Sequence, residues 1–244
     1  MASFDDQAIE KFFDQIEATL SSALPFNDED VHFSVDLNAD NGIYVAEFEV
    51  PLYHGYGTVG SFRELTKPPS DLFQVFIRYQ MGSDRNRQHL TVQYSKFELR
   101  VHTSPGVRFE YEREKNNVPA AHIHFSGMGG LLTPALMKNF SGRNKGKGKA
   151  KKGGQIQSVH FPVGGHRFRP SLEDFLYFVI EECGFTGLHG WEKKLQDSRN
   201  VWFDHQLSAS VRDHPEHAAE ALRKLGYKVE SPATPPSVNR HDGW

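Results

Sequence analysis

The sequence predicts an α+β fold, in which an N-terminal helix, an antiparallel β-meander sheet and a C-terminal helical layer follow one another. Apolar side chains recur at helical spacing near the N-terminus, alternate with polar ones over residues 31–125, and return to helical spacing after Ser171. Short strands joined by turns rich in Gly, Pro, Asn and Asp are typical of an antiparallel meander. Helices that are separated from the strands along the chain favour α+β over alternating α/β.

The first helix is expected over residues 5–22, where apolar residues fall on one face, and Pro25 ends it. The expected strands cover residues 31–35, 44–50, 73–80, 89–102 (one long strand or a bent pair), 107–113, 121–125 and 158–161. Ser171 is a suitable N-cap for the next helix, because Glu173 and Asp174 follow in its first turn, where the helix dipole favours acids. Two more helices are expected over residues 191–211 and 215–225.

The length of 244 residues fits one domain over residues 1–230, sheet-rich over 1–170 and helical over 171–230. Residues 138–154 interrupt the pattern, since six positive charges lie between Arg143 and Lys152 with no acid among them. Such a segment is expected to be a flexible basic loop. Residues 231–244 contain three prolines and are expected to form a loose tail.

The formal charge of −3 excludes a global electrostatic attraction to nucleic acid or to an anionic membrane. A single cysteine, Cys183, excludes an intramolecular disulfide and a Cys-rich zinc site. Cys183 is expected to be a buried, inert thiol at the end of an apolar helix. No signal peptide and no run of about 18 apolar residues is recognisable, so we expect a cytoplasmic protein without a membrane partner.

Two histidines, His122 and His124, lie two residues apart on an expected strand, so their side chains point to the same face. If the strand that carries His160 pairs with this one, three imidazoles line one surface, where they can bind a metal, transfer protons or contact phosphate. The alternative is that they are half-buried structural residues. We take His122, His124, His160 and His166 as catalytic candidates, and we assign no cofactor and no metal ligand.

The stretch from Pro162 to Ser171 is a candidate anion site. Gly164 and Gly165 permit a backbone turn that other residues avoid, and a helix N-terminus follows, with free N–H groups. Arg167 and Arg169 are therefore candidate phosphate ligands, expected on one side of the chain while Phe168 faces the core. Alternatively, the arginines pair with acids such as Glu173 or Asp174 and only fix the turn.

The basic segment is a candidate nucleic-acid contact, because cations on a flexible tether can follow a phosphate backbone. Its candidate residues are Arg143, Lys145, Lys147, Lys149, Lys151 and Lys152. The alternative is a solvated insertion without a partner.

The order of a strand with Arg108-Phe-Glu-Tyr, a His-x-His strand, a basic insertion, a His-Phe-Pro strand and an amphipathic helix resembles the small bacterial toxin family of the TumE type. The resemblance covers residues 92–182 and implies a sheet with clustered histidines and a toxin or defence role. It is a similarity of element order, so no catalytic residue is carried over from it. The long N-terminal meander and the added C-terminal helices depart from that family.

Three functions are consistent with these features. The first is an enzyme that acts on a phosphodiester in RNA or a nucleotide, with histidines as acid and base and with phosphate held by the arginines and the helix N-terminus. The second is a non-catalytic module that binds a protein partner or nucleic acid. The third is a metal-dependent hydrolase.

Overall fold

The computed structural model describes residues 6–38, 42–55, 57–83, 90–114, 118–126 and 160–234. Its helices are α1 (Asp6–Ala23), α4 (Leu172–Tyr177), α5 (Trp191–Asp213) and α6 (Pro215–Lys224), with 3-10 turns at Asp28–Asp30 and Phe62–Glu64 and a π-helical turn at Phe178–Glu182. Its strands are β1 (His32–Asn38), β2 (Ile43–Pro51), β3 (Thr58–Val59), β4 (Phe73–Ser83), β5 (Leu90–Val101), β6 (Ser104–Glu112), β7 (Ala121–Phe125), β8 (Phe161–Pro162) and β9 (Gly187–Leu188).

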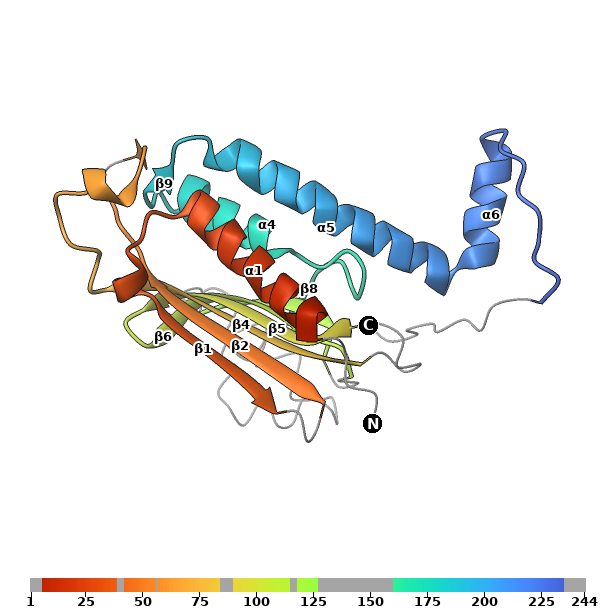
Figure 1. Ribbon diagram of the computed structural model, residues 1–244, viewed down its shortest axis with the longest axis horizontal. Helices are drawn as coiled ribbons and strands as arrows, with labels where there is room; N and C mark the ends of the chain where they lie inside the picture. Colours follow the sequence, from red (N-terminus) through yellow and green to blue (C-terminus); the bar gives the residue numbers. More distant parts are fainter. Residues whose placement is uncertain are drawn as a thin grey trace, which may run out of the picture.

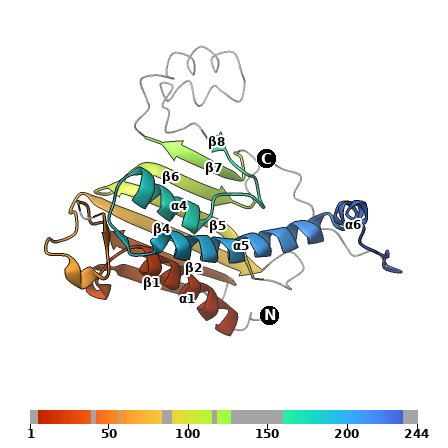
Figure 2. The ribbon, with the colours of Figure 1, turned by 90° about the horizontal axis from the view of Figure 1, so that it is seen from above.

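Seven strands form one antiparallel sheet in the order β1-β2-β4-β5-β6-β7-β8. Helices α1, α4 and α5 lie across one face of it (Figure 1, Figure 2). The predicted α+β class with an antiparallel sheet and N- and C-terminal helices is therefore confirmed. Residues 90–101 form one long strand, β5, and its register against β6 shifts between Leu99 and Arg100.

A second, two-stranded sheet was not predicted. It pairs β3 with β9 in parallel, with Thr58 opposite Gly187 and Val59 opposite Leu188. Two-residue strands show no alternation, and their partners are far apart in the sequence, so local patterns give no signal for this pairing. The small sheet joins the segment after β2 to the segment between α4 and α5.

The core lies between the sheet and the helices. Along β2, the residues that face the helices are Tyr44, Ala46, Phe48 and Val50, and all four are buried. Phe175 and Leu176 of α4 have no exposed surface at all. Complete burial of such a side chain contributes about 2 kcal/mol. The helices are therefore stabilised with their apolar stripes against the sheet.

Helix α4 begins with the predicted cap and ends differently from expectation. The Ser171 hydroxyl accepts from the Asp174 amide at 3.2 Å, and the Asp174 carboxylate accepts from the Ser171 amide at 2.9 Å, which completes a capping box. The π-helical turn then rotates the following residues, so Cys183 is exposed and the expected burial is wrong. Partial desolvation, and then the charge of Glu182, raise the pKa of its thiol.

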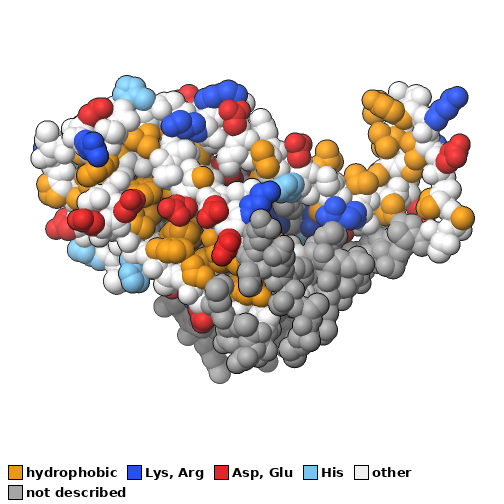
Figure 3. Space-filling model, viewed as in Figure 1, with side chains coloured by type: hydrophobic (Ala, Val, Ile, Leu, Met, Phe, Trp, Pro, Cys, Tyr) orange, Lys and Arg blue, Asp and Glu red, His pale blue; other side chains and the backbone are white. Residues whose placement is uncertain are grey.

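Among the described helices, none combines the length and the apolar character needed to cross a membrane. On the face seen in the space-filling view, acidic, basic and apolar side chains are mixed, and α6 projects from the body of the molecule (Figure 3). Beside α6, Leu225 and Tyr227 are 75% and 64% exposed.

Candidate functional site

The register of β6 and β7 assembles a polar cluster on the face of the sheet opposite the helices. Glu110 pairs with His122, and Arg108 pairs with His124, so these side chains share one face. Pairing of β7 with β8 brings His160 beside them. The three imidazole centroids form a nearly equilateral triangle, with sides of 4.9 Å (His122–His124), 4.6 Å (His122–His160) and 4.8 Å (His124–His160).

The three imidazoles present one nitrogen each within 4.8 Å of one another. A zinc ion bound to histidine has Zn–N distances of about 2.0–2.1 Å, so a shift of the rings by about an ångström or less would place all three around one ion. His122 is only 1% exposed, whereas His124 and His160 are partly accessible. The cluster is therefore built into the sheet with one side open.

The hydrogen bond made by Nδ1 of His122 determines the role of its other ring nitrogen, Nε2. Its Nδ1 lies 2.7 Å from the backbone carbonyl oxygen of Pro119, which can only accept, so Nδ1 carries the proton. The buried Nε2 has no well-formed hydrogen bond among the described residues, and Glu110 Oε2 lies 3.4 Å from it. In neutral His122 two acceptors would face each other there, which is unfavourable unless Nε2 is protonated or a cation lies between them.

Glu110 is the carboxylate shared by this cluster. Its Oε2 lies 3.4 Å from Nε2 of both His122 and His124, and its Oε1 accepts from the Tyr94 hydroxyl at 2.5 Å. Burial raises the pKa of Glu110, but its contacts with the two histidines, the hydrogen bond from Tyr94 and the charge of Arg108 outweigh it and hold the pKa well below its usual range. Burial, and then the contact with Glu110, raise the pKa of Tyr94, so its hydroxyl remains a donor.

A network of ion pairs continues from the histidines across the same face. Glu98 is 2% exposed, and its two oxygens accept from Arg100 at 2.7 Å and from Arg108 at 2.6 Å. Arg100 also donates to Glu49 at 2.8 Å, and Arg108 approaches Glu110 at 3.8 Å. Acids and bases therefore alternate over this face, and Arg108 joins the network to the histidine cluster.

The structure does not bring the arginine turn to the histidine cluster. The Tyr111 hydroxyl lies 3.2 Å from His166 Nδ1, and the Arg169 guanidinium lies 4.2 Å from the centre of the Tyr111 ring. Tyr111 follows Glu110 on β6 and points to the other face. His166, Arg167 and Arg169 therefore lie on the side of the sheet that α1, α4 and α5 cover, whereas the other three candidate histidines lie on the opposite side.

The turn itself has the conformation that its glycines predict, with φ of +62° at Gly164 and +60° at Gly165. Arg167 and Arg169 both point toward α5, but Phe168 is 57% exposed, so the expectation that it faces the core is wrong. The reason is that residues 164–167 form a turn, in which the alternation of a strand does not apply.

The arginines do not pair with the acids of the α4 start. Arg167 makes a two-pronged ion pair with Asp213, at 2.6 and 3.0 Å, and Arg169 donates to the His166 carbonyl at 2.5 Å. Glu173 instead accepts from Ser198, and Asp174 from Arg199. The first turn of α4 is thus occupied by its own capping box and two acids, which disfavours an anion there.

The candidate nucleic-acid residues between Arg143 and Lys152 lie outside the described residues. Sequence reasoning missed Glu110 and Tyr94, although the alternation of residues 108–112 already placed Arg108 and Glu110 on one face. It lacked the register that sets Glu110 opposite His122.

No protein-family model, no curated protein and no solved structure matches this chain. The likeness to TumE-type toxins therefore stays a prediction from element order, and the function has to be argued from the site.

Proposed function

We propose that this protein is a metal-dependent hydrolase, with a divalent ion held by His122, His124 and His160 beside Glu110. The observation that carries the proposal is the buried Nε2 of His122, which faces a carboxylate oxygen at 3.4 Å while Nδ1 is committed to a carbonyl. A cation among the three imidazoles satisfies that nitrogen and the carboxylate together. Metal-binding histidines usually donate the N–H of their other ring nitrogen to a carbonyl or a carboxylate, as Nδ1 of His122 does to Pro119.

A set of three histidines suits catalysis better than a purely structural role. Zinc sites with three protein ligands keep a fourth position for water, and the ion lowers the pKa of that water to about 7. An ion held by the three histidines would supply a water activated for attack on an electrophilic centre, and the leaving group would take up a proton as the bond to its oxygen breaks. Glu110 supplies negative charge at the edge of the cluster.

The substrate class that we propose is a phosphodiester. Arg108 lies on the strand beside His124, its side chain is 31% exposed, and a guanidinium is well suited to hold a phosphate oxygen near the ion. The phosphodiester substrate is the one that the sequence predicted. The proposed phosphate ligand is now Arg108, in place of Arg167 and Arg169. The reason is that Arg167 and Arg169 lie across the sheet from the histidines.

One observation favours a second candidate, a metal-free acid–base enzyme. Glu110 Oε2 is equally distant from the Nε2 atoms of His122 and His124, so doubly protonated imidazole could satisfy the same contact. In that case one protonated histidine donates a proton to the leaving oxygen, and a neutral histidine accepts one from the attacking nucleophile.

The test is metal analysis and hydrolysis by the full chain, purified without a histidine tag. We expect about one equivalent of zinc or manganese, and cleavage of bis(p-nitrophenyl) phosphate that a chelator abolishes and the metal restores. His124→Ala and His160→Ala are expected to lower metal affinity by about 100-fold or more, because each removes a ligand. His217→Ala, at an exposed position of α6, is the matched control and should change neither property.

The outcomes separate the two candidates. Cleavage that survives chelation but disappears in both histidine variants would favour metal-free catalysis. A protein that binds no divalent ion, and whose variants cleave as well as the parent, would overturn both. Circular dichroism of each variant shows whether a loss reflects the site or the fold.

A further inference from the structure

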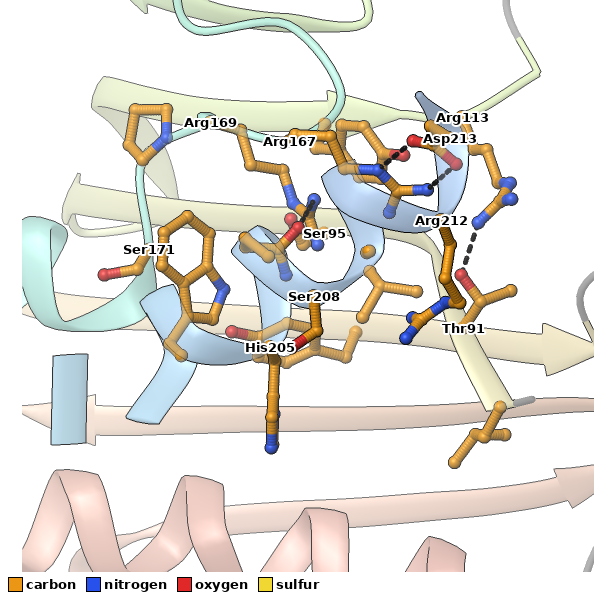
Figure 4. A pocket seen from close by; sticks show the side chains of 18 of the residues that line it. Thr91, Ser95, Arg113, Arg167, Arg169, Ser171, His205, Ser208, Arg212 and Asp213 are labelled. Carbon is orange, nitrogen blue, oxygen red and sulfur yellow. Dashed lines mark hydrogen bonds and ion pairs between the residues drawn. The ribbon is translucent and has the colours of Figure 1, made fainter. Parts of the chain in front are cut away.

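A cavity of about 740 Å³ lies on the helix side of the sheet, below the C-terminal half of α5. Its walls come from β4, β5, β6, α5 and the turn before α4 (Figure 4). The lining residues that matter here are Arg113, Arg167, Arg169, Arg212, Tyr79 and Trp202. This volume lies within the range of about 300–1,000 Å³ that is typical of sites for small ligands.

Positive charge is in excess around this cavity. Four arginines line it, and Asp213 is the one carboxylate among its described lining residues. Asp213 already makes two hydrogen bonds with Arg167. No ion pair involves Arg212 in the described part of the chain, and it lies at the rim beside Thr91 (Figure 4).

The other two arginines, Arg113 and Arg169, both contact polar groups of the cavity wall. Arg113 is buried and donates to the Thr91 hydroxyl, while Glu114, outside the cavity and exposed, reaches its Nε at 3.7 Å. Arg169 donates to the His166 carbonyl and, at 3.4 Å, to Gln206. The described acceptors of Arg169 are neutral, and burying a guanidinium on neutral acceptors is costly, so an anion in the cavity would offset that cost.

The repulsion between these guanidiniums is visible at Arg169. Burial lowers the pKa of Arg169, Tyr111 and Tyr79 act against that effect, and the positive charges of Arg167 and Arg113 lower the pKa further. The geometry leads to the same conclusion, since the arginines converge on one space from α5, from the turn before α4 and from the residue that follows β6.

Aromatic side chains supply the other half of the site. Trp202 on α5 and Tyr79 on β4 line the cavity, and Arg169 lies 4.2 Å from the ring centre of Tyr111 and 5.9 Å from that of Trp202. Flat side chains that flank clustered guanidiniums suit a ligand with a planar ring and a phosphate.

We propose that this cavity binds a nucleoside phosphate, with the phosphate held by Arg212, Arg113 and Arg169 and the base packed against Trp202. The site is separate from the histidine cluster, because the two lie on opposite faces of the sheet. The proposal therefore does not depend on the metal centre. The arginines of the Gly-Gly turn would then contact an anion in the cavity, and not an anion at the N-terminus of α4.

Isothermal titration of the full chain with AMP, adenosine and inorganic phosphate tests this proposal. We expect one AMP per chain, with adenosine and phosphate each bound at least about 10-fold more weakly, since each lacks half of the contacts. Arg212→Gln should weaken AMP binding by about 10-fold. Arg223→Gln, at an exposed arginine of α6 outside the cavity, should leave it unchanged.

The second variant is Trp202→Phe, which keeps an aromatic ring but removes the indole. The change in tryptophan fluorescence that AMP causes in the parent should be lost in this variant. The proposal is overturned if AMP does not bind at millimolar concentration, or if AMP binds equally well to the parent and to Arg212→Gln. Equal affinity for phosphate and AMP would overturn the ring contact. His124→Ala should bind AMP like the parent, and a loss there would overturn the separation of the two sites.

Discussion

The two faces of the sheet bury charged side chains in different ways. On the face opposite α1, α4 and α5, Glu98 is matched by Arg100 and Arg108, so that network is nearly complete without a ligand. On the helix side, four arginines and one aspartate are the Arg, Asp and Glu residues among the described residues that line the cavity. The two faces therefore differ in where a ligand is needed. A balanced network holds strands together, whereas an excess of one charge, or two acceptors facing each other at His122 and Glu110, marks a place that a ligand can complete.

The largest effect is expected inside the balanced network. Glu98→Ala should lower the free energy of unfolding by about 4 kcal/mol, because it leaves Arg100 and Arg108 without their buried carboxylate. Urea unfolding measures this, with Glu29→Ala, in an exposed turn, as a control that should change little. A loss below about 1 kcal/mol would mean that the network is not structural and would remove the contrast between the faces.

The second prediction concerns the turn on the helix side. Gly164→Ala should cost about 3 kcal/mol of unfolding free energy, because its φ is positive and a Cβ would lie 1.6 Å from the Phe168 carbonyl oxygen. Gly165→Ala is the matched control, since Gly165 has the same φ but its Cβ would meet nothing within 4 Å, and about 1 kcal/mol is expected.

The same pair of variants shows whether the two faces bind their ligands independently. Gly164→Ala displaces Arg167 and Arg169, so AMP affinity should fall while the bound metal is retained. Parallel loss of metal and AMP binding at a temperature where circular dichroism shows a folded chain would indicate that the two sites are coupled.

The third prediction tests whether the cavity has too much positive charge. Asp213→Asn should cost about 2 kcal/mol of stability, since it weakens two charge-assisted hydrogen bonds from Arg167. It should also strengthen AMP binding several-fold, because Arg167 becomes available to the phosphate. Asp197→Asn, which removes an exposed charge of α5 outside the cavity, is the control for a general charge effect. Weaker AMP binding in Asp213→Asn alone would indicate that Asp213 positions the site.

Local patterns predicted much of this architecture because they depend on neighbours in the sequence. The capping box at Ser171 and Asp174 and the positive φ of Gly164 follow from residue types at fixed short spacings. The shared face of His122 and His124 follows from the two-residue period of a strand. In each case the interacting groups lie within a few residues of one another.

What could not be predicted depends on register and on packing between distant segments. Glu110 meets His122 only because β6 and β7 pair with that register, and Asp213 meets Arg167 only because α5 crosses the sheet. The exposure of Cys183 depends on a π-helical turn that helical periodicity does not reveal. Because of such contacts, Arg167 and Arg169 lie on the other side of the sheet from His160, although they are close to it in the sequence.

The smallest effect is expected at Tyr94, a positioning residue for the histidine cluster. Tyr94→Phe removes the hydroxyl that donates to Glu110 Oε1 at 2.5 Å and leaves the ring in place. Metal affinity should fall by about 10-fold, as is usual when a residue behind the ligands is lost, and stability should change by about 1 kcal/mol or less. Tyr177→Phe, at a half-exposed position of α4, is the matched control. AMP affinity should be the same in all three proteins, because Tyr94 points away from the cavity. Unchanged metal affinity in Tyr94→Phe would show that Glu110 needs no support from this strand, and the metal site would then rest on the histidines alone.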